Sequence, residues 1–354
     1  MPGAISNIET HHIILISFGI SAAICWLVLV TKQLHVDFTT GQDAGPQTVH
    51  AGTVPRIGGF GIFLSLLVTW FIAKADLSAF SAVILFSSIF VFAAGILEDI
   101  TGKISPKLRL FFSLLTGLTF VLLADVTIST VSIPLIDSLL QWWPLSAFLT
   151  ILAIAAVSNA INVIDGLNGL SIGSCSFMGL SIGYLAFMQG DIVLAGFAFL
   201  YVSSLVGVGV FNFPFGKIFV GDGGAYLMGA VIAMLAILLP ERNPEISPFA
   251  SLLIIIYPFY ELLRSLFRRL LLGGNALLPD SKHLHSVMYH GNLMVIGRDK
   301  IVRNYVTTLM VLPLPAFCSL WAGLFFESVI FLCAGLFIFA MSYEVLTRIY
   351  RRQP

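Results

Sequence analysis

The residues of this 354-residue chain that could carry out chemistry stand in short polar clusters between long apolar stretches. One cluster holds the adjacent carboxylates Glu98 and Asp99, directly after an apolar run. Carboxylates so close to an apolar span cost free energy unless they are paired, and two neighbouring carboxylates repel each other. The pair therefore predicts a metal ion, a lysine or a shared proton. A capped helix end balanced by Lys103 and Lys107 is the structural alternative.

A second cluster repeats polar residues every three positions, with Asn159, Asn162 and Asp165 followed by Asn168. On a helix this spacing keeps side chains near one face. Four such groups would be costly against lipid. The pattern predicts a face that binds the donors and acceptors of a ligand, and hydrogen bonds between helices are the alternative.

A third cluster places Asp222 in the glycine-rich run Gly221–Gly224, at the start of an apolar segment. A glycine turn at a helix N-terminus favours phosphate, and a carboxylate favours Mg²⁺. The chain contains no GxxxxGK[ST] motif, so this turn is not a P-loop. The nearby Phe219 could stack on a base.

Two further clusters are basic. His283 and His285 alternate in a basic segment, and no cysteine stands near them to complete a zinc site. Histidines in such surroundings suit phosphate binding or proton transfer. Arg56 precedes Gly58 and Gly59, and glycines permit close approach of the backbone. Two interpretations of this segment stay open: a contact with the substrate, or an ordinary helix start.

The elements that must position these clusters are membrane helices. Hydrophobic residues make up 58% of the chain and charged residues 10%, against about 25% charged residues in a soluble domain. The composition predicts an all-α polytopic membrane protein embedded in a lipid bilayer. A formal net charge of zero excludes a basic nucleic-acid binder, so we expect no nucleic-acid partner.

Apolar runs near the ~20-residue length of a membrane span predict ten or eleven transmembrane helices. The runs lie at about 13–31, 57–73, 78–97, 108–124, 144–163, 169–188, 191–211, 225–240, 248–267, 305–322 and 328–346. With the N-terminus outside, all of the 18 Lys and Arg residues except Lys74 and Arg242 face the cytoplasm. This orientation puts the C-terminus and all five clusters on the cytoplasmic side. The alternating β-branched residues 127–133 predict a short strand pair on the outer side.

The clusters, in this order, resemble those of the polyprenyl-phosphate N-acetylhexosamine-1-phosphate transferases. That family includes the phospho-N-acetylmuramoyl-pentapeptide translocase and the initiating transferases of O-antigen synthesis. The resemblance runs from about residue 46 to 290 and rests mainly on NxxNxxDGxNGL at 159–170 and FxGDGG at 219–224. The His-Leu-His triplet at 283–285 is more similar to the O-antigen type.

The resemblance implies one integral membrane transferase domain over residues 1–354, in the inner (plasma) membrane. It implies transfer of N-acetylhexosamine 1-phosphate from a UDP-N-acetylhexosamine to polyprenyl (undecaprenyl) phosphate, with release of UMP. This would be the initiating step of lipopolysaccharide, O-antigen or cell wall synthesis. The implied cofactor is Mg²⁺, with Mn²⁺ as a second choice, and formation of a homodimer stays open.

The resemblance also assigns roles to the clustered residues. Asp222 is the expected metal ligand, and Glu98, Asp99 and Asp165 are the expected catalytic residues. The expected substrate-binding residues are Arg56, Asn159, Asn162, Asn168, Phe219, His283 and His285.

The chain departs from the family pattern at two of these positions. Glu98 stands where the family usually has Asp, which leaves the role of Glu98 open. Asn168 stands where the family often has Asp; its amide can form hydrogen bonds with a ligand but cannot neutralise a cation. Because of Glu98, an inactive binding member of the family is one alternative function. A secondary transporter of an anionic substrate is the other, although transporter sites lie near the midplane and often between inverted repeats.

Overall fold

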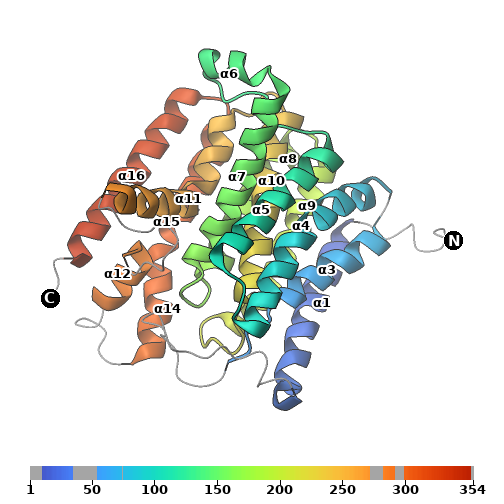
Figure 1. Ribbon diagram of the computed structural model, residues 1–354, viewed down its shortest axis with the longest axis vertical. Helices are drawn as coiled ribbons and strands as arrows, with labels where there is room; N and C mark the ends of the chain where they lie inside the picture. The colour runs from blue at the N-terminus through green and yellow to red at the C-terminus, as the bar shows by residue number, and fades with distance from the viewer. Residues whose placement is uncertain (1–9, 35–53, 74, 272–281, 292–298, 352–354) are drawn as a thin grey trace.

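The computed structural model describes residues 10–34, 54–73, 75–271, 282–291 and 299–351, and the regular structure of these residues is helical (Figure 1). Ten segments of this part are long and apolar enough to cross a membrane. They are α1 (Thr10–Val30), α4 (Ala75–Thr101), α5 (Pro106–Ala124), α7 (Trp143–Ile164), α8 (Leu170–Met188), α9 (Ile192–Asn212), α10 (Gly221–Arg242), α11 (Pro248–Leu271), α14 (Lys300–Val311) together with α15 (Pro313–Phe325), and α16 (Val329–Arg351). The predicted polytopic membrane class is confirmed. The run predicted at 57–73 forms a shorter apolar helix, α3 (Gly59–Ile72).

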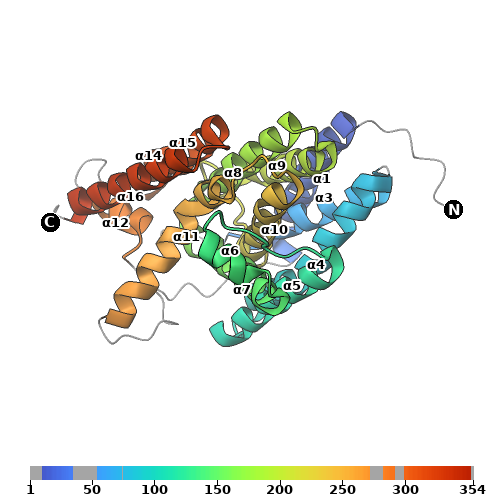
Figure 2. The same cartoon turned by 90° about the horizontal axis from the view of Figure 1, so that it is seen from above.

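Helix α10 is the centre of the bundle, and it lies between α4, α7 and α8 (Figures 1 and 2). In its most apolar window 94% of the residues are buried, against 22% in α1 and in α16. The outer helices therefore leave most of their residues at least partly exposed, as helices that face lipid do. The N-terminal end of α10, which carries Asp222, is thus held on several sides.

Glycines bring the start of α10 into close contact with two neighbouring helices. A Cβ atom on Gly95 of α4 would lie 2.4 Å from the Cα of Gly223. A Cβ atom on Gly59 of α3 would lie 2.5 Å from the Cα of Gly224. Because no side chain separates these backbones, small shifts of α3 or α4 must move the first turn of α10.

The strand pair predicted at residues 127–133 is wrong: these described residues form no strand, and α6 (Pro134–Leu140) follows them. Side chains of α7 and α10 accept hydrogen bonds from backbone N–H groups of this segment. The N–H of Ile128 donates to Thr150 Oγ1 at 2.8 Å, and the N–H of Ser129 donates to Glu241 Oε1 at 2.7 Å. With these partners available, the segment has no need of a ladder between strands.

The polar clusters gather at the end of the bundle opposite α6. Helices α4 and α7 end there, α5, α8 and α10 begin there, and α12 (Leu284–Gly291) and α14 lie beside them in the lower part of Figure 1. Helix α11 contains Pro258, which removes a helical hydrogen bond, and its second half turns outward from the bundle (Figures 1 and 2). Lys74 and residues 46–53, which the orientation and the resemblance include, lie outside the described residues.

Candidate active site

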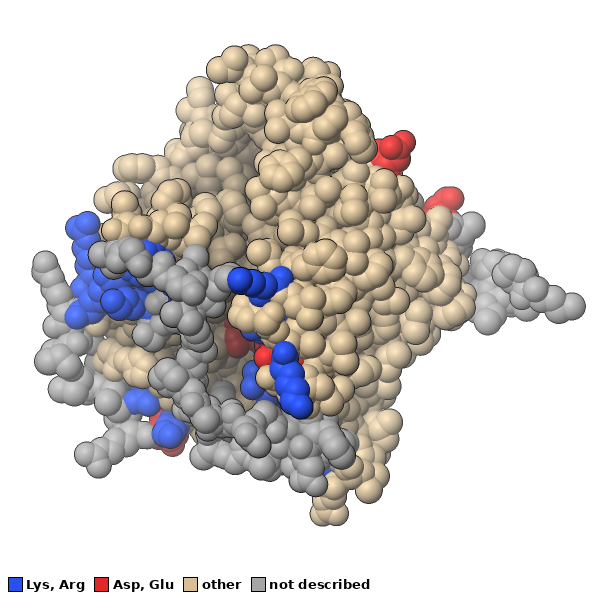
Figure 3. Space-filling view, in the orientation of Figure 1, with Lys and Arg blue, Asp and Glu red and all other residues tan. Residues whose placement is uncertain are grey.

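Asp222, in the first turn of α10, is the centre of the site. Its carboxylate forms an ion pair with the guanidinium of Arg109 from α5. The side-chain amide of Asn162 from α7 donates to its Oδ1 at 3.2 Å. The Asp222 side chain keeps 16% of its surface exposed. Figure 3, drawn in the orientation of Figure 1, shows acidic atoms recessed between Lys and Arg side chains in the lower part of the molecule. The site thus offers a partly open carboxylate and a fixed cation.

Asp99, at the end of α4, binds the backbone at the start of α10. Its Oδ1 accepts the N–H of Asp222 at 2.8 Å, and its Oδ2 accepts the N–H of Gly223 at 2.9 Å. This is the favourable position for a carboxylate at a helix N-terminus. The phosphate predicted at this helix start is not supported, because Asp99 already occupies these two N–H groups. Asp99 is buried and acts on Asp222 through the backbone.

Gly221 allows two backbone segments to cross beside Asp99. Its φ is +76°, a conformation that residues with a side chain rarely adopt. A Cβ atom here would lie 1.8 Å from the carbonyl oxygen of Arg56 and 2.6 Å from Asp99 Oδ2. Only glycine fits this crossing.

Phe219 holds the segment before α3 against the segment before α10. Its N–H donates to the carbonyl of Pro55 at 2.9 Å, and its carbonyl accepts the N–H of Gly58 at 2.9 Å. Arg56 and Phe219, far apart in sequence, are therefore neighbours at the site. Both side chains are half-buried.

Glu98 does not share the partners of Asp99. Its Oε2 accepts the N–H of Ile104 at 2.6 Å and so closes the turn after α4. The extra methylene of Glu lets this carboxylate reach its own turn, six residues on.

Asn159 and Asn162 lie on one face of α7, as their spacing predicts. The amide of Asn159 donates to Ser113 Oγ at 3.2 Å, and its carbonyl oxygen accepts the hydroxyl of Tyr226 at 3.4 Å. Asn159 thus joins α5, α7 and α10 about one helical turn before Asn162, which contacts Asp222.

Asp165 stands at the C-cap of α7 and accepts a hydrogen bond from the hydroxyl of Ser171. Burial raises the pKa of Asp165 to about 7; the Ser171 hydrogen bond lowers it, and the charge of Asp222 raises it. Asp165 is therefore a half-buried carboxyl group whose pKa responds to the charge of Asp222.

The prediction that Asn168 continues the face of α7 is wrong, because the helix ends at Ile164. Asn168 is buried, its N–H donates to Asn304 Oδ1 of α14 at 2.9 Å, and its amide donates to the carbonyl of Pro214 at 3.0 Å. These contacts join two loops and α14, and none of them involves the Asp222 carboxylate.

His283 and His285, at the start of α12, are both buried. A Cβ atom on Gly166 would lie 2.8 Å from Nε2 of His285, so this ring contacts the turn that follows Asp165. Burial lowers the pKa of His285 to about 4, and its ring is neutral at pH 7. The histidines therefore belong to the same end of the bundle as Asp222.

The sequence prediction missed two residues that hold this site together. Arg109 pairs with Asp222, and Glu261 of α11 binds His283 Nδ1 at 3.0 Å. Glu261 is an acid inside an apolar span, where a charge is costly, and this position was the signal that could have found it. Arg109 lies in the first turn of α5, two residues after Lys107, and nothing local marks it as the partner of Asp222.

Among the described residues, no three His, Cys, Asp or Glu side chains lie together as a metal site. Mg²⁺, however, is commonly held by one or two carboxylates together with substrate phosphates and water. A partly open Asp222 that already binds a cationic group fits such a site. The residues present therefore suit a metal that arrives with a phosphate ligand.

Comparison with known proteins agrees with this picture. Residues 81–240 match the family model of glycosyl transferase family 4. The undecaprenyl-phosphate alpha-N-acetylglucosaminyl 1-phosphate transferase of Yersinia pestis is 26% identical over 68% of this chain and 66% of its own length. The probable undecaprenyl-phosphate N-acetylglucosaminyl 1-phosphate transferase of Bacillus subtilis (strain 168) is 26% identical over 72% of this chain and 71% of its own. The chain thus spans just under two thirds of the Yersinia relative. The resemblance drawn from the motifs is confirmed.

Proposed function

We propose that this member of glycosyl transferase family 4 transfers N-acetylhexosamine 1-phosphate from a UDP-sugar to polyprenyl phosphate and releases UMP. The names of the relatives describe transfer of N-acetylglucosaminyl 1-phosphate to undecaprenyl phosphate. The observation that carries the proposal is the partly open Asp222 carboxylate, held by Arg109 and Asn162 at the ends of three helices. A transporter would need its binding groups near the midplane.

In the proposed reaction an oxygen of the lipid phosphate attacks the phosphorus that bears the sugar. The bond from this phosphorus to the oxygen that bridges the two phosphates breaks, and UMP leaves with the electron pair. Both reactants are anions, so positioning and neutralisation of charge supply most of the catalysis. The lipid phosphate is already a nucleophile, and we therefore favour direct displacement over a covalent relay through a carboxylate.

Asp222 is the residue that we propose as the ligand of Mg²⁺, or of Mn²⁺. When bound, the ion would neutralise the diphosphate and the leaving phosphate. Arg109 and Asn162 keep the Asp222 carboxylate in place. Asp99 orients the first turn of α10. The half-buried Asp165 carboxyl is a further catalytic candidate, because the charge of Asp222 acts on it.

Four of the remaining predicted residues are proposed to bind the substrates. Phe219 is the candidate to stack on the uracil, and Arg56 is the candidate to meet a phosphate. His283 and His285 are the candidates to contact the sugar diphosphate. Asn304 of α14 binds the Asn168 turn, which favours the whole chain as a single transferase domain.

The proposed function is tested with purified protein, polyprenyl phosphate, Mg²⁺ and a panel of UDP-N-acetylhexosamines. We expect UMP release with at least one donor, and loss of release when the metal is chelated. No UMP from any donor, with the protein folded, would contradict the transferase proposal. Uptake of an anionic substrate into vesicles without chemistry would instead favour the transporter.

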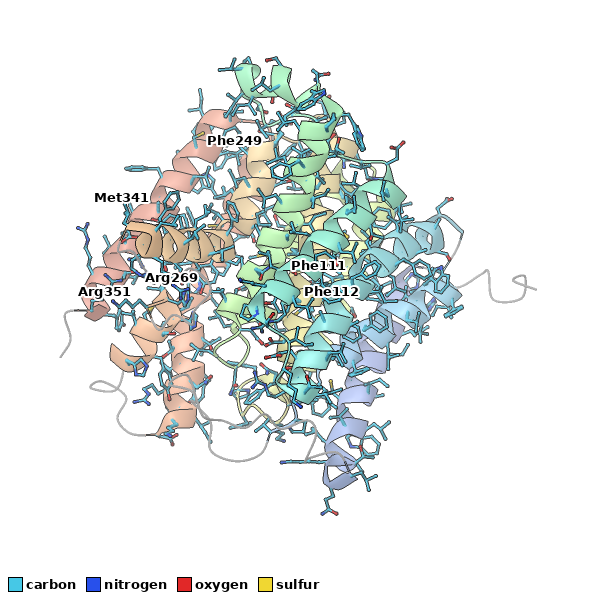
Figure 4. All side chains as sticks on the ribbon, in the orientation of Figure 1. Phe111, Phe112, Phe249, Arg269, Met341 and Arg351 are labelled. Carbon is cyan, nitrogen blue, oxygen red and sulfur yellow. The ribbon has the colours of Figure 1, made fainter. Side chains whose placement is uncertain are left out.

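We propose the inner (plasma) membrane as the location and the cytoplasmic face as the active side. The basic ends of α11 and α16 support this orientation, and Arg269 and Arg351 lie on the same side of the molecule (Figure 4).

The orientation predicts which engineered cysteines react in intact spheroplasts. In a Cys333→Ser background, S138C on α6 should react with a membrane-impermeant maleimide. The exposed K103C, at the other end, should react only after permeabilisation. Labelling in the reverse order would overturn the assignment of sides.

A further inference from the structure

We infer that Glu261 is a positioning residue that fixes the tautomer of His283 and holds α12 at the candidate active site. This inference rests on the proposed function. Glu261 lies in α11, three residues after Pro258, and only 1% of it is exposed. A carboxylate buried inside a membrane span is costly unless it is paired, so its two partners indicate its role.

Both oxygens of Glu261 bind the start of α12. Oε2 lies 3.0 Å from Nδ1 of His283, and Oε1 accepts the N–H of Leu284 at 3.0 Å. An ionised carboxylate can only accept hydrogen bonds, so Nδ1 must carry the ring proton. In the neutral ring Nε2 is then the acceptor, because the partner of one nitrogen sets the state of the other.

The contact continues from His283 to the turn beside Asp165. The rings of His283 and His285 are parallel, with centroids 5.7 Å apart. The Nε2 of His285 packs against Gly166, and its Nδ1 is buried without a hydrogen-bond partner. By holding α12, Glu261 therefore sets where the histidine pair meets the polar turn of the site.

A simple helix cap would not need this arrangement. Asp299 caps α14 from the adjacent position, with Oδ1 accepting the N–H groups of Ile301 and Val302. Glu261 instead reaches α12 from another helix, 22 residues away in sequence, and gives one oxygen to an imidazole. A residue that only capped α12 would not need the bond to the His283 imidazole, so this bond indicates that Glu261 orients the histidine.

The tautomer of His283 is the first test. We expect the ¹⁵N spectrum of histidine-labelled protein in lipid nanodiscs to show His283 protonated at Nδ1, the signal being assigned by its absence in H283Q. Glu261→Gln leaves one acceptor oxygen for two donors, so its His283 should change tautomer or become mixed. A wild-type His283 with its proton on Nε2 overturns the inference, whether or not any variant folds.

The kinetic test separates the two substrates. For E261Q we expect kcat/KM for the UDP-sugar to fall on the order of 10- to 100-fold, the range seen when a ligand-orienting partner is lost. The KM for polyprenyl phosphate should not change. Glu261→Asp keeps two acceptor oxygens and should recover part of the activity.

The matched control is Glu344→Gln on α16. Glu344 accepts hydrogen bonds from Arg264 and Tyr260 of α11 rather than from a histidine. We expect E344Q to keep wild-type kinetics and the wild-type tautomer. Unchanged donor kinetics in folded E261Q, or an equal loss toward both substrates with the tautomer kept, overturns the inference. If the wild type releases no UMP, the proposed function fails, and the tautomer still decides the role of Glu261.

Discussion

Replacing Asp222 by asparagine is expected to abolish turnover, with a fall in kcat on the order of 10³-fold or more, the scale of losing a charge-stabilising group. Asparagine has nearly the same shape but no charge. It can neither bind the proposed metal as an anion nor neutralise Arg109, whose side chain is only 19% exposed. UMP release should be near background at every Mg²⁺ concentration. Wild-type and D222N protein are compared across a Mg²⁺ titration.

Asp191→Asn is the control for this variant. Asp191 also pairs with an arginine, accepting from Arg242 Nε at 2.6 Å, but it lies at the opposite end of the bundle. We expect D191N to keep its activity and its Mg²⁺ dependence. Turnover by D222N that still rises with Mg²⁺ would show that the metal assignment is wrong.

Gly221→Ala is expected to reduce kcat about 10²-fold, the effect of misplacing a catalytic group by about 1 Å. The added Cβ would lie 1.8 Å from the carbonyl oxygen of Arg56, so one of the two backbones must move. Either movement disturbs the hydrogen bonds from Asp222 and Gly223 to Asp99. We also expect unfolding free energy to fall by about 1–3 kcal/mol, the usual cost of overpacking. UMP release and thermal unfolding in detergent measure the two effects.

Gly190→Ala separates steric conflict from backbone strain. Gly190 has a φ of +79°, close to the +76° of Gly221, but a Cβ atom there would meet nothing within 4 Å. Alanine at both positions adopts the same unfavourable conformation, at about 1–2 kcal/mol. We expect G190A to lose a little stability and no activity. Equal activity losses in G190A and G221A would contradict the crossing at Arg56 as the cause.

The membrane class and the positions of the helices could be predicted from the sequence, because a segment that crosses lipid must be apolar along its length and must satisfy its own backbone hydrogen bonds. A run of apolar residues is enough to predict a helix in a bilayer, whatever its neighbours are. For the same reason the few charged residues marked the polar clusters, and the structure brings Asp99, Asn162 and Asp222 together. Helix α3 was predicted too long, since its apolar run includes an entry segment that binds Phe219 instead of continuing the helix.

The partner of each polar group could not be predicted, because the partners lie far apart in the chain. Asp99 binds the start of α10 across 123 residues, Arg109 reaches Asp222 across 113, and Asn168 reaches Asn304 across 136. No local spacing contains such pairs.

The sequence by itself therefore determined that the chain crosses a membrane many times and which few residues could be active there, since burying charge in lipid is costly. Only the tertiary structure decided what each residue does. Glycine contacts between α3, α4 and α10 bring backbones within reach of Asp99, so this acid caps a helix and Asp222 is left partly open. Glu98, beside Asp99 in sequence, turns to its own loop. Two adjacent acids receive different roles because neighbours on a helix point in different directions.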